Sequence, residues 1–147
     1  MEIDIPAVKK EHVGFEFDEA TFEIKTEKLL NYAKACGETE ARFVDSESPD
    51  FRAVPNYASN FHGRRNLPEN FPADIRRSFD AGKCCESFAA IRPGDTITGR
   101  SHIHDIYEKT GRSGPMMFVV HRMEFTNQDG TKVAIVDWRL VMRLGEM

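Results

Sequence analysis

The chain has 147 residues and a formal net charge of −4, with 30% charged and 40% hydrophobic residues. This composition is typical of a soluble protein, and a chain of this length can bury roughly 70% of its unfolded surface without a disulfide or a metal ion. The acidic balance argues against a nucleic-acid partner, and no apolar run approaches the ~20 residues that a membrane span requires. We therefore expect one domain over residues 1–147 that contacts neither nucleic acid nor membrane.

The cysteines and the amino terminus indicate the compartment. Three cysteines without the spacing of a disulfide framework, Cys36, Cys84 and Cys85, are typical of a reducing environment. The adjacent pair Cys84 and Cys85 could be a redox or metal pair, but two small residues facing opposite sides of a strand explain it better. The first residues lack a signal-peptide pattern, so we expect a cytoplasmic protein.

The first third of the chain predicts one strand and one helix. Residues 1–14 show no clear period, and the segments 15–17 and 21–24 then alternate apolar and polar side chains, which predicts a half-buried strand. Thr26 is a plausible N-cap for a helix that Gly37 would end. An apolar stripe at helical spacing supports this helix: Leu29, Tyr32, Ala33 and Cys36.

Residues 38–72 carry no strong period and are punctuated by prolines, which predicts a long irregular connection. Loops of this length in compact domains are often functional. Within it we expect a short buried helix around Pro55–Phe61, because Tyr57, Ala58 and Phe61 could share one face.

The remainder of the chain reads as strands from Phe79 onward. Ile97 and Ile103 have the same parity whereas Ile106 has the other, which predicts a bulge between them. Met116–Val120 is apolar on both parities and is expected to be a central strand covered on both faces. The last strand alternates, with Trp138 on its apolar face.

Several segments resemble a known family in order along about 120 residues. They are Phe22 to Gly37, Phe79 to Gly82 with Glu86 to Phe88, Ile91 to Asp95, Lys109 to Gly111 with Gly114 to Met116, and Thr126 to Ala134. Together they resemble the MaoC-like dehydratase N-terminal domain, also called the FAS1-like dehydratase domain. The resemblance implies an α+β hot-dog fold, in which an antiparallel sheet wraps around a helix. It also implies hydration of 2-enoyl thioesters, usually of CoA, or the reverse reaction, with no cofactor beyond the CoA of the substrate.

Active hydratases of this kind carry an Asp and a His in a segment reading Gly-Asp-x-Asn-Pro-x-His after the first helix. The pair is needed because water must lose a proton as it attacks the β-carbon, and a proton must reach the α-carbon. Here Glu38 stands at the Asp position and Phe43 at the His position. A phenylalanine cannot transfer protons, so the usual dyad is absent.

Two explanations of this departure remain open. In the first, the chain is the non-catalytic subunit of a heteromeric enoyl-CoA hydratase, a heterodimer or heterotetramer whose other MaoC-like chain supplies Asp and His. The altered segment would then shape a pocket for bulky acyl groups, such as steroid side-chain CoA esters. In the second, Glu38 is the base of a self-sufficient hydratase or thioesterase. A non-enzymatic acyl-CoA or acyl-carrier binding module is a third reading from a different class.

Residues for substrate binding can be nominated in the long connection. Arg64 and Arg65 could meet the phosphates of CoA, since guanidinium groups suit oxyanions, although a solvated basic loop is the plainer reading. We include Tyr57 and Phe61 beside them as substrate-binding candidates. His102 and His104 would share a strand face, but without a third ligand they do not predict a metal site.

Overall fold

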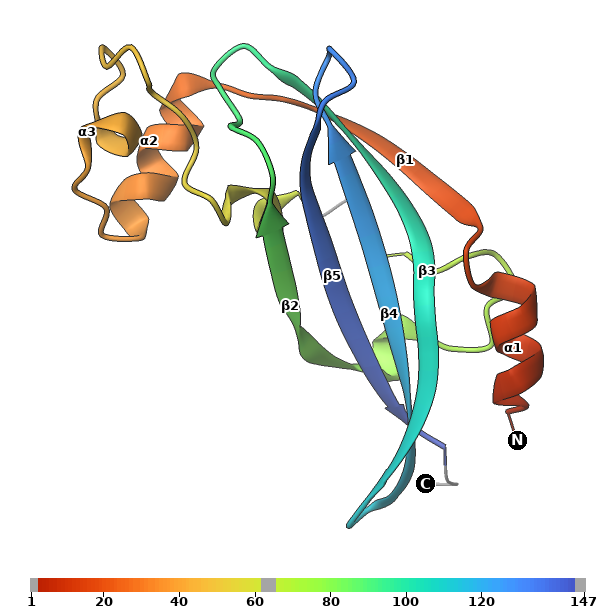
Figure 1. Cartoon of the computed structure of the whole chain (residues 1–147). Helices are drawn as coiled ribbons and strands as arrows, with labels where there is room; N and C mark the ends of the chain where they lie inside the picture. Colours follow the sequence, from red (N-terminus) through yellow and green to blue (C-terminus); the bar gives the residue numbers. More distant parts are fainter. Residues whose placement is uncertain (1–2, 62–65, 145–147) are drawn as a thin grey trace.

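The computed structural model describes residues 3–61 and 66–144. Its centre is one five-stranded antiparallel sheet in the order β1-β3-β4-β5-β2, shown in Figure 1. The strands are β1 (Glu16–Glu23), β2 (Phe79–Ser87), β3 (Thr96–Gly111), β4 (Gly114–Thr126) and β5 (Lys132–Arg143). β3, β4 and β5 are consecutive hairpin partners and form the long middle of the sheet, whereas β1 and β2 form its edges.

The helical elements are short. They are α1 (Ile5–His12), α2 (Thr26–Ala35), α3 (Ala41–Val44) and the 3-10 turns η1 (Tyr57–Asn60) and η2 (Ile75–Arg77). Figure 1 shows α2 and α3 together beyond one end of the strands and α1 beside the middle and lower part of β3. None of the helices in the described residues is long and apolar enough to cross a membrane.

One face of the sheet, here called the inner face, carries the core. Near α2 a first cluster joins Leu29 and Ala33 of α2 to Ile97, Phe125 and other residues of the strands. Near α1 a second cluster joins Val8 of α1 to Ile103, Val119 and Leu140. η1 packs against β2 and β5. The sheet therefore curls over several short helical segments, not over one long helix.

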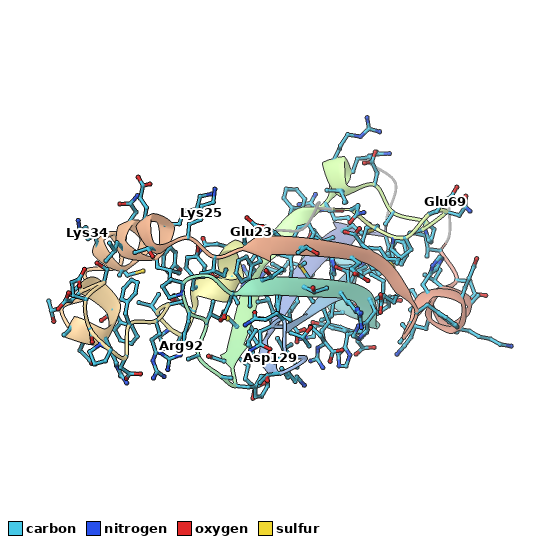
Figure 2. All side chains as sticks on the ribbon, turned by 90° about the horizontal axis from the view of Figure 1, so that it is seen from above. Glu23, Lys25, Lys34, Glu69, Arg92 and Asp129 are labelled. Atoms are coloured by element: carbon cyan, nitrogen blue, oxygen red, sulfur yellow. The ribbon has the colours of Figure 1, made fainter. Side chains whose placement is uncertain are left out.

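The opposite face, here called the outer face, is open in the described part of the chain. In Figure 1 the segment 66–78 runs behind the strands, and no helix crosses in front of the middle of β3, β4 and β5. Figure 2, viewed from above, places Glu69 of that segment on one side of β1 and β3 and Asp129 of the β4–β5 loop on the other. Side chains on the outer face thus meet solvent or another molecule.

Most of the strand predictions are confirmed. The register of β3 against β4 shifts between Ile103 and Asp105, so Ile97, Ile103 and Ile106 are all fully buried despite their different parities. β4 is the central strand of the five, as predicted, but it is not covered on both faces: Met116 and Phe118 on its outer face are only partly buried. On β5 the predicted apolar parity faces the core, with Trp138 7% exposed. Cys84 is exposed and Cys85 is half-buried, as expected for neighbours on opposite faces, and both are free thiols.

The helix predictions need two corrections. Residues 5–12 form α1, which was not predicted because the segment is too short to show a clear period. Asp4 caps this helix by accepting a hydrogen bond from the Ala7 amide, and Pro6 lies in its first turn. Thr26 is the first helical residue of α2 rather than its N-cap, which is Lys25. The predicted short helix near Pro55 is confirmed as η1, with Tyr57 and Ala58 buried.

Candidate functional site

A cavity of about 200 Å³ opens beside α3 at the α2 end of the molecule. Three stretches far apart in sequence build it: the start of α3, the segment 52–55 and the chain that leaves β2. Its walls are mostly apolar, with two arginines among them. The lining residues are Arg42, Phe43, Arg52, Ala53, Val54, Pro55, Ser87, Phe88, Ala89, Ala90 and Ile91.

The end of α2 delivers Phe43 to this cavity. Gly37, at φ 74°, donates to the carbonyl of Lys34, and the amide of Glu38 donates to the carbonyl of Ala33. This pair of bonds is the Schellman arrangement that ends a helix and reverses the chain. The chain then enters α3, where Phe43 is 5% exposed and the Arg42 guanidinium lies 4.7 Å from the centre of its ring.

Two backbone hydrogen bonds hold the walls together. The amide of Arg52 donates to the carbonyl of Arg42 at 2.9 Å, and the amide of Ala53 donates to the carbonyl of Ile91 at 2.8 Å. The segment 52–55 is thereby fixed between α3 and the chain after β2. Buried amides that are paired in this way make a defined wall rather than a loose loop.

Arginines give the rim of the cavity its charge. Arg42 pairs with Glu40 at 2.9 Å, Arg52 donates to Asp50, and Arg92 reaches the same Asp50 carboxylate at 3.3 Å. The hydrogen bond from Arg52 lowers the pKa of Asp50. The two arginines in the cavity wall, Arg42 and Arg52, are therefore paired with acids outside it, and a guanidinium group of this kind can also bind an anionic group such as a phosphate.

The chemistry available inside the cavity is limited. Of the described residues that line it, none bears a carboxylate or an imidazole. The two arginines stay protonated at all relevant pH values and cannot act as bases. The cavity walls can therefore enclose an apolar group and attract an anion, but they cannot move protons to and from a reacting carbon.

The structure separates the candidate residues that the sequence nominated. Phe43 lines the cavity, whereas Glu38 is half-buried at the end of α2 and is not among the lining residues. Tyr57 and Phe61 are each 7% exposed and belong to the core cluster nearby, outside the cavity walls. Arg64 and Arg65 lie outside the described residues, so their predicted role in phosphate binding remains a prediction.

Tyr57 and Phe61 instead form an aromatic cluster. The ring of Phe61 stacks on Phe22 at a centroid distance of 4.7 Å, meets Tyr57 edge-on at 5.4 Å and contacts Phe125 at 5.3 Å. Burial raises the pKa of the Tyr57 hydroxyl. These ring contacts hold the segment 51–61 against the core. Tyr57 and Phe61 therefore belong to the core next to the cavity and not to its wall.

The histidines form no metal centre in the described structure. His102 and His104 approach each other to 3.4 Å between ring nitrogens, and burial lowers the pKa of His102. No group of three or more potential ligands surrounds these or any other described residues. His121, which the sequence placed inside an apolar strand, is 3% exposed, and neither of its ring nitrogens has a hydrogen-bond partner among the described residues.

The cavity itself was not predicted from the sequence. Its walls come from residues 42–43, 52–55 and 87–91, and no local period links these stretches. The one available signal was the motif comparison, which singled out position 43 without giving its surroundings.

Comparison with known proteins identifies the family. The family model described as "FAS1-like, dehydratase domain region" matches residues 11–136. The chain belongs to this family. No curated protein matches the FAS1-like dehydratase chain at a significant level.

Solved structures confirm that the FAS1-like dehydratase chain has the hot-dog fold. One is the HadBC (3R-hydroxyacyl-ACP dehydratase) complex from Mycobacterium tuberculosis, with 18% identity over 96% of this chain and 99% of that chain and a TM-score of 0.68. Another is the MaoC-like dehydratase from Rhodospirillum rubrum, with 19% identity over 92% and 94% of the two chains and a TM-score of 0.62. A third is the ChsH1-ChsH2 complex from Mycobacterium tuberculosis, with 14% identity over 97% and 90% and a TM-score of 0.67.

Proposed function

We propose that this chain is the pocket-forming subunit of an enoyl-thioester hydratase, and that a second MaoC-like chain supplies the catalytic Asp and His. One observation carries the proposal: Phe43, at the position where the family motif has its histidine, lies in the wall of a cavity whose lining residues include no carboxylate and no imidazole. Hydration needs two groups that transfer protons. We infer that they come from another polypeptide.

The chain would contribute binding and orientation. The apolar walls around Phe43 and Phe88 suit an acyl chain, and the rim arginines suit the phosphates of CoA or of a carrier-linked thiol. Enclosing the thioester away from water would strengthen the hydrogen bonds that stabilise its enolate-like intermediate. CoA enters as part of the substrate, and no further cofactor is proposed.

Two of the similar structures support the assembly. HadBC and ChsH1-ChsH2 are both described as complexes by their titles, and each match covers nearly all of this chain. A partner of similar fold for this chain is consistent with them. The free cysteines of the described chain agree with the reducing cytoplasm in which we place the complex.

The acyl group is proposed to be bulky, as in steroid side-chain CoA esters. The cavity of about 200 Å³ in this chain is smaller than ligand sites of roughly 300–1,000 Å³. A bulky acyl group therefore requires the partner subunit to complete the pocket, which agrees with a shared active site.

Reconstitution tests this function. The chain would be co-expressed with a MaoC-like chain that contains Asp and His, sought first in the neighbouring reading frames, and hydration of crotonyl-CoA and of a steroid side-chain enoyl-CoA would be followed. We expect the complex to turn over, and replacing the partner's Asp or His to abolish the activity. A complex that binds acyl-CoA but hydrates neither substrate would favour the binding module. Turnover that survives loss of the partner's dyad would favour Glu38.

A further inference from the structure

The outer face of the sheet carries an apolar row that crosses four strands. Cross-strand pairing places Tyr107 of β3 opposite Phe118 of β4, Phe118 opposite Val141 of β5, and Val141 opposite Phe79 of β2. Directly paired residues on neighbouring strands point to the same side of a sheet. The rings of Tyr107 and Phe118 stack at 5.0 Å with an interplanar angle of 4°, and Phe79 is 62% exposed.

This row does not belong to the protein's own core. Neither of the two core clusters includes Tyr107, Phe118, Val141 or Phe79, because both clusters form on the inner face. The neighbouring outer-face residue Val120 is only 9% exposed. An apolar row with a well-packed centre, on a face that no described helix covers, is the kind of surface that other proteins contact.

The charges on either side of β4 are complementary to each other. The register pairs Val120 of β4 with Asp105 of β3 on one side and with Arg139 of β5 on the other. Asp105 and Arg139 thus flank Val120 at one strand spacing each, about 4.8 Å. Arg139 is exposed and has no ion pair within the described residues, whereas Asp105 is partly satisfied by Lys9 at 3.2 Å.

This arrangement fits a second copy of the same chain. A two-fold axis along β4 exchanges its two sides, so it would lay each Asp105 over the partner's Arg139 and each Val120 over its own counterpart. The same operation lays Phe118 on Phe118 and Tyr107 on Val141, which buries the apolar row against itself. Two sheets packed face to face in this way make an aligned sandwich.

The next row along the strands does not oppose this packing. There the axis brings two copies of Arg122 together, but each is held by its own Asp137 through hydrogen bonds of 2.8 and 2.9 Å. Its charge is therefore already neutralised within the subunit. Lys109 and Arg143, which would face like charges, lie near the strand ends. The ammonium of Lys109 lies 5.5 and 5.7 Å from the ring centres of Tyr107 and Phe118, so it covers part of the apolar row and has to turn toward solvent when the row is buried.

We propose that two copies of this chain associate back to back through the outer face, about a two-fold axis along β4, with Asp105 and Arg139 pairing across the interface. The interface uses neither the cavity nor Phe43. The proposed interface can therefore be tested independently of the proposed catalytic role and of the MaoC-like partner.

Charge-reversal variants of the whole chain test the geometry by sedimentation equilibrium. Arg139→Glu and Asp105→Arg should each halve the mass of the wild-type species, because each faces the partner with two like-charged pairs. The two variants mixed together should associate again. In the mixed pair the glutamate introduced at position 139 meets the arginine introduced at position 105, and the unchanged Asp105 meets the unchanged Arg139. Lys28→Glu on α2 makes the same change of charge away from this face and should leave the mass unchanged.

The outcomes separate clearly. We expect the dissociation constant of each single variant to rise by about tenfold or more, and the mixture to return close to wild type. A wild-type chain that is monomeric at all concentrations would overturn the proposal, as would a wild-type mass that neither variant changes. If Asp105→Arg unfolds because Asp105 also binds Lys9, Phe118→Glu replaces it: like charges on the axis should likewise halve the mass.

Discussion

Gly99 of β3 lies directly opposite Phe125 of β4, so close that a Cβ atom at position 99 would stand 2.6 Å from Cε1 of the phenylalanine. Phe125 is fully buried in the core cluster near α2, and its ring also contacts Phe61 and Phe22. Glycine at this position is therefore a packing requirement of the inner face and not a turn residue.

Gly99→Ala should accordingly destabilise the fold by about 1–3 kcal/mol, because the ring cannot move without disturbing its aromatic neighbours. Chemical denaturation measures the loss. Gly111→Ala is the matched control on the same strand, since its nearest atom is the flexible Met116 methyl at 3.0 Å; it should cost much less. Equal losses for the two variants would contradict the packing argument.

Phe43 and Phe88 line the same cavity but should respond differently to truncation. Phe43 is 5% exposed and belongs to the core cluster, whereas Phe88 is 47% exposed. Phe43→Ala should lower the free energy of unfolding by about 3–5 kcal/mol, and Phe88→Ala by less than ~1 kcal/mol. Because Phe88→Ala keeps the fold, it is the variant with which to ask whether the cavity binds acyl-CoA, by calorimetry.

The buried imidazole of His121 should make stability depend on pH. Burial lowers its pKa to about 4, while the charge of Asp18 acts in the opposite direction. The unfolded chain therefore binds the proton at a higher pH than the folded one does. Stability from this group is complete above its unfolded pKa near 6.5 and is lost progressively as the pH falls toward 4, by about 3 kcal/mol in total.

His121→Leu removes that titration and should flatten the profile of unfolding free energy between pH 7 and 4. The leucine also removes two ring nitrogens that have no hydrogen-bond partner among the described residues, so the variant should be no less stable at pH 7. A profile that keeps its full slope in this variant would assign the dependence to other groups, such as the carboxylates.

The ion pair of Arg122 and Asp137 should stabilise the fold more than an exposed ion pair does. Both side chains are about three-quarters buried, with 24% and 22% exposure, and the hydrogen bonds that Arg122 donates to Asp137 raise the pKa of the guanidinium. A double-mutant cycle to alanine should give a coupling energy of about 1–2 kcal/mol. The exposed pair of Arg76 and Asp74 provides the comparison and should give a smaller coupling energy. Similar coupling energies would show that burial contributes nothing.

The sequence predicted the sheet well because its signals are local. The alternation of apolar and polar side chains was enough to predict the register shift near Ile103 and the exposed side of β5. The apolar run at Met116–Val120 predicted the central strand of the sheet. α1 was missed because eight residues hold only two turns of pattern, although Asp4 and Pro6 are typical of a helix start. The family was predicted correctly from several segments that each resemble it only weakly, because they occur in the expected order along the chain.

The site was harder to predict because it depends on distant contacts. Phe43 was singled out by its motif position, but its place in the cavity depends on backbone bonds from Arg52 and Ala53 to residues 10 and 38 positions away. Tyr57 and Phe61 carried the aromatic character expected of a binding site, yet tertiary packing placed them in the core. The outer-face row likewise emerges only when strand register is known.

The most direct test of the central claim is the hydration rate of the purified chain by itself. The loss of absorbance of a 2-enoyl-CoA would be followed with wild type and with Glu38→Gln, at substrate concentrations high enough to saturate a weak site. A chain without its own proton-transferring pair should show no turnover above the uncatalysed rate in either form. Turnover by the lone wild-type chain that disappears in Glu38→Gln would contradict the account and make Glu38 the catalytic base.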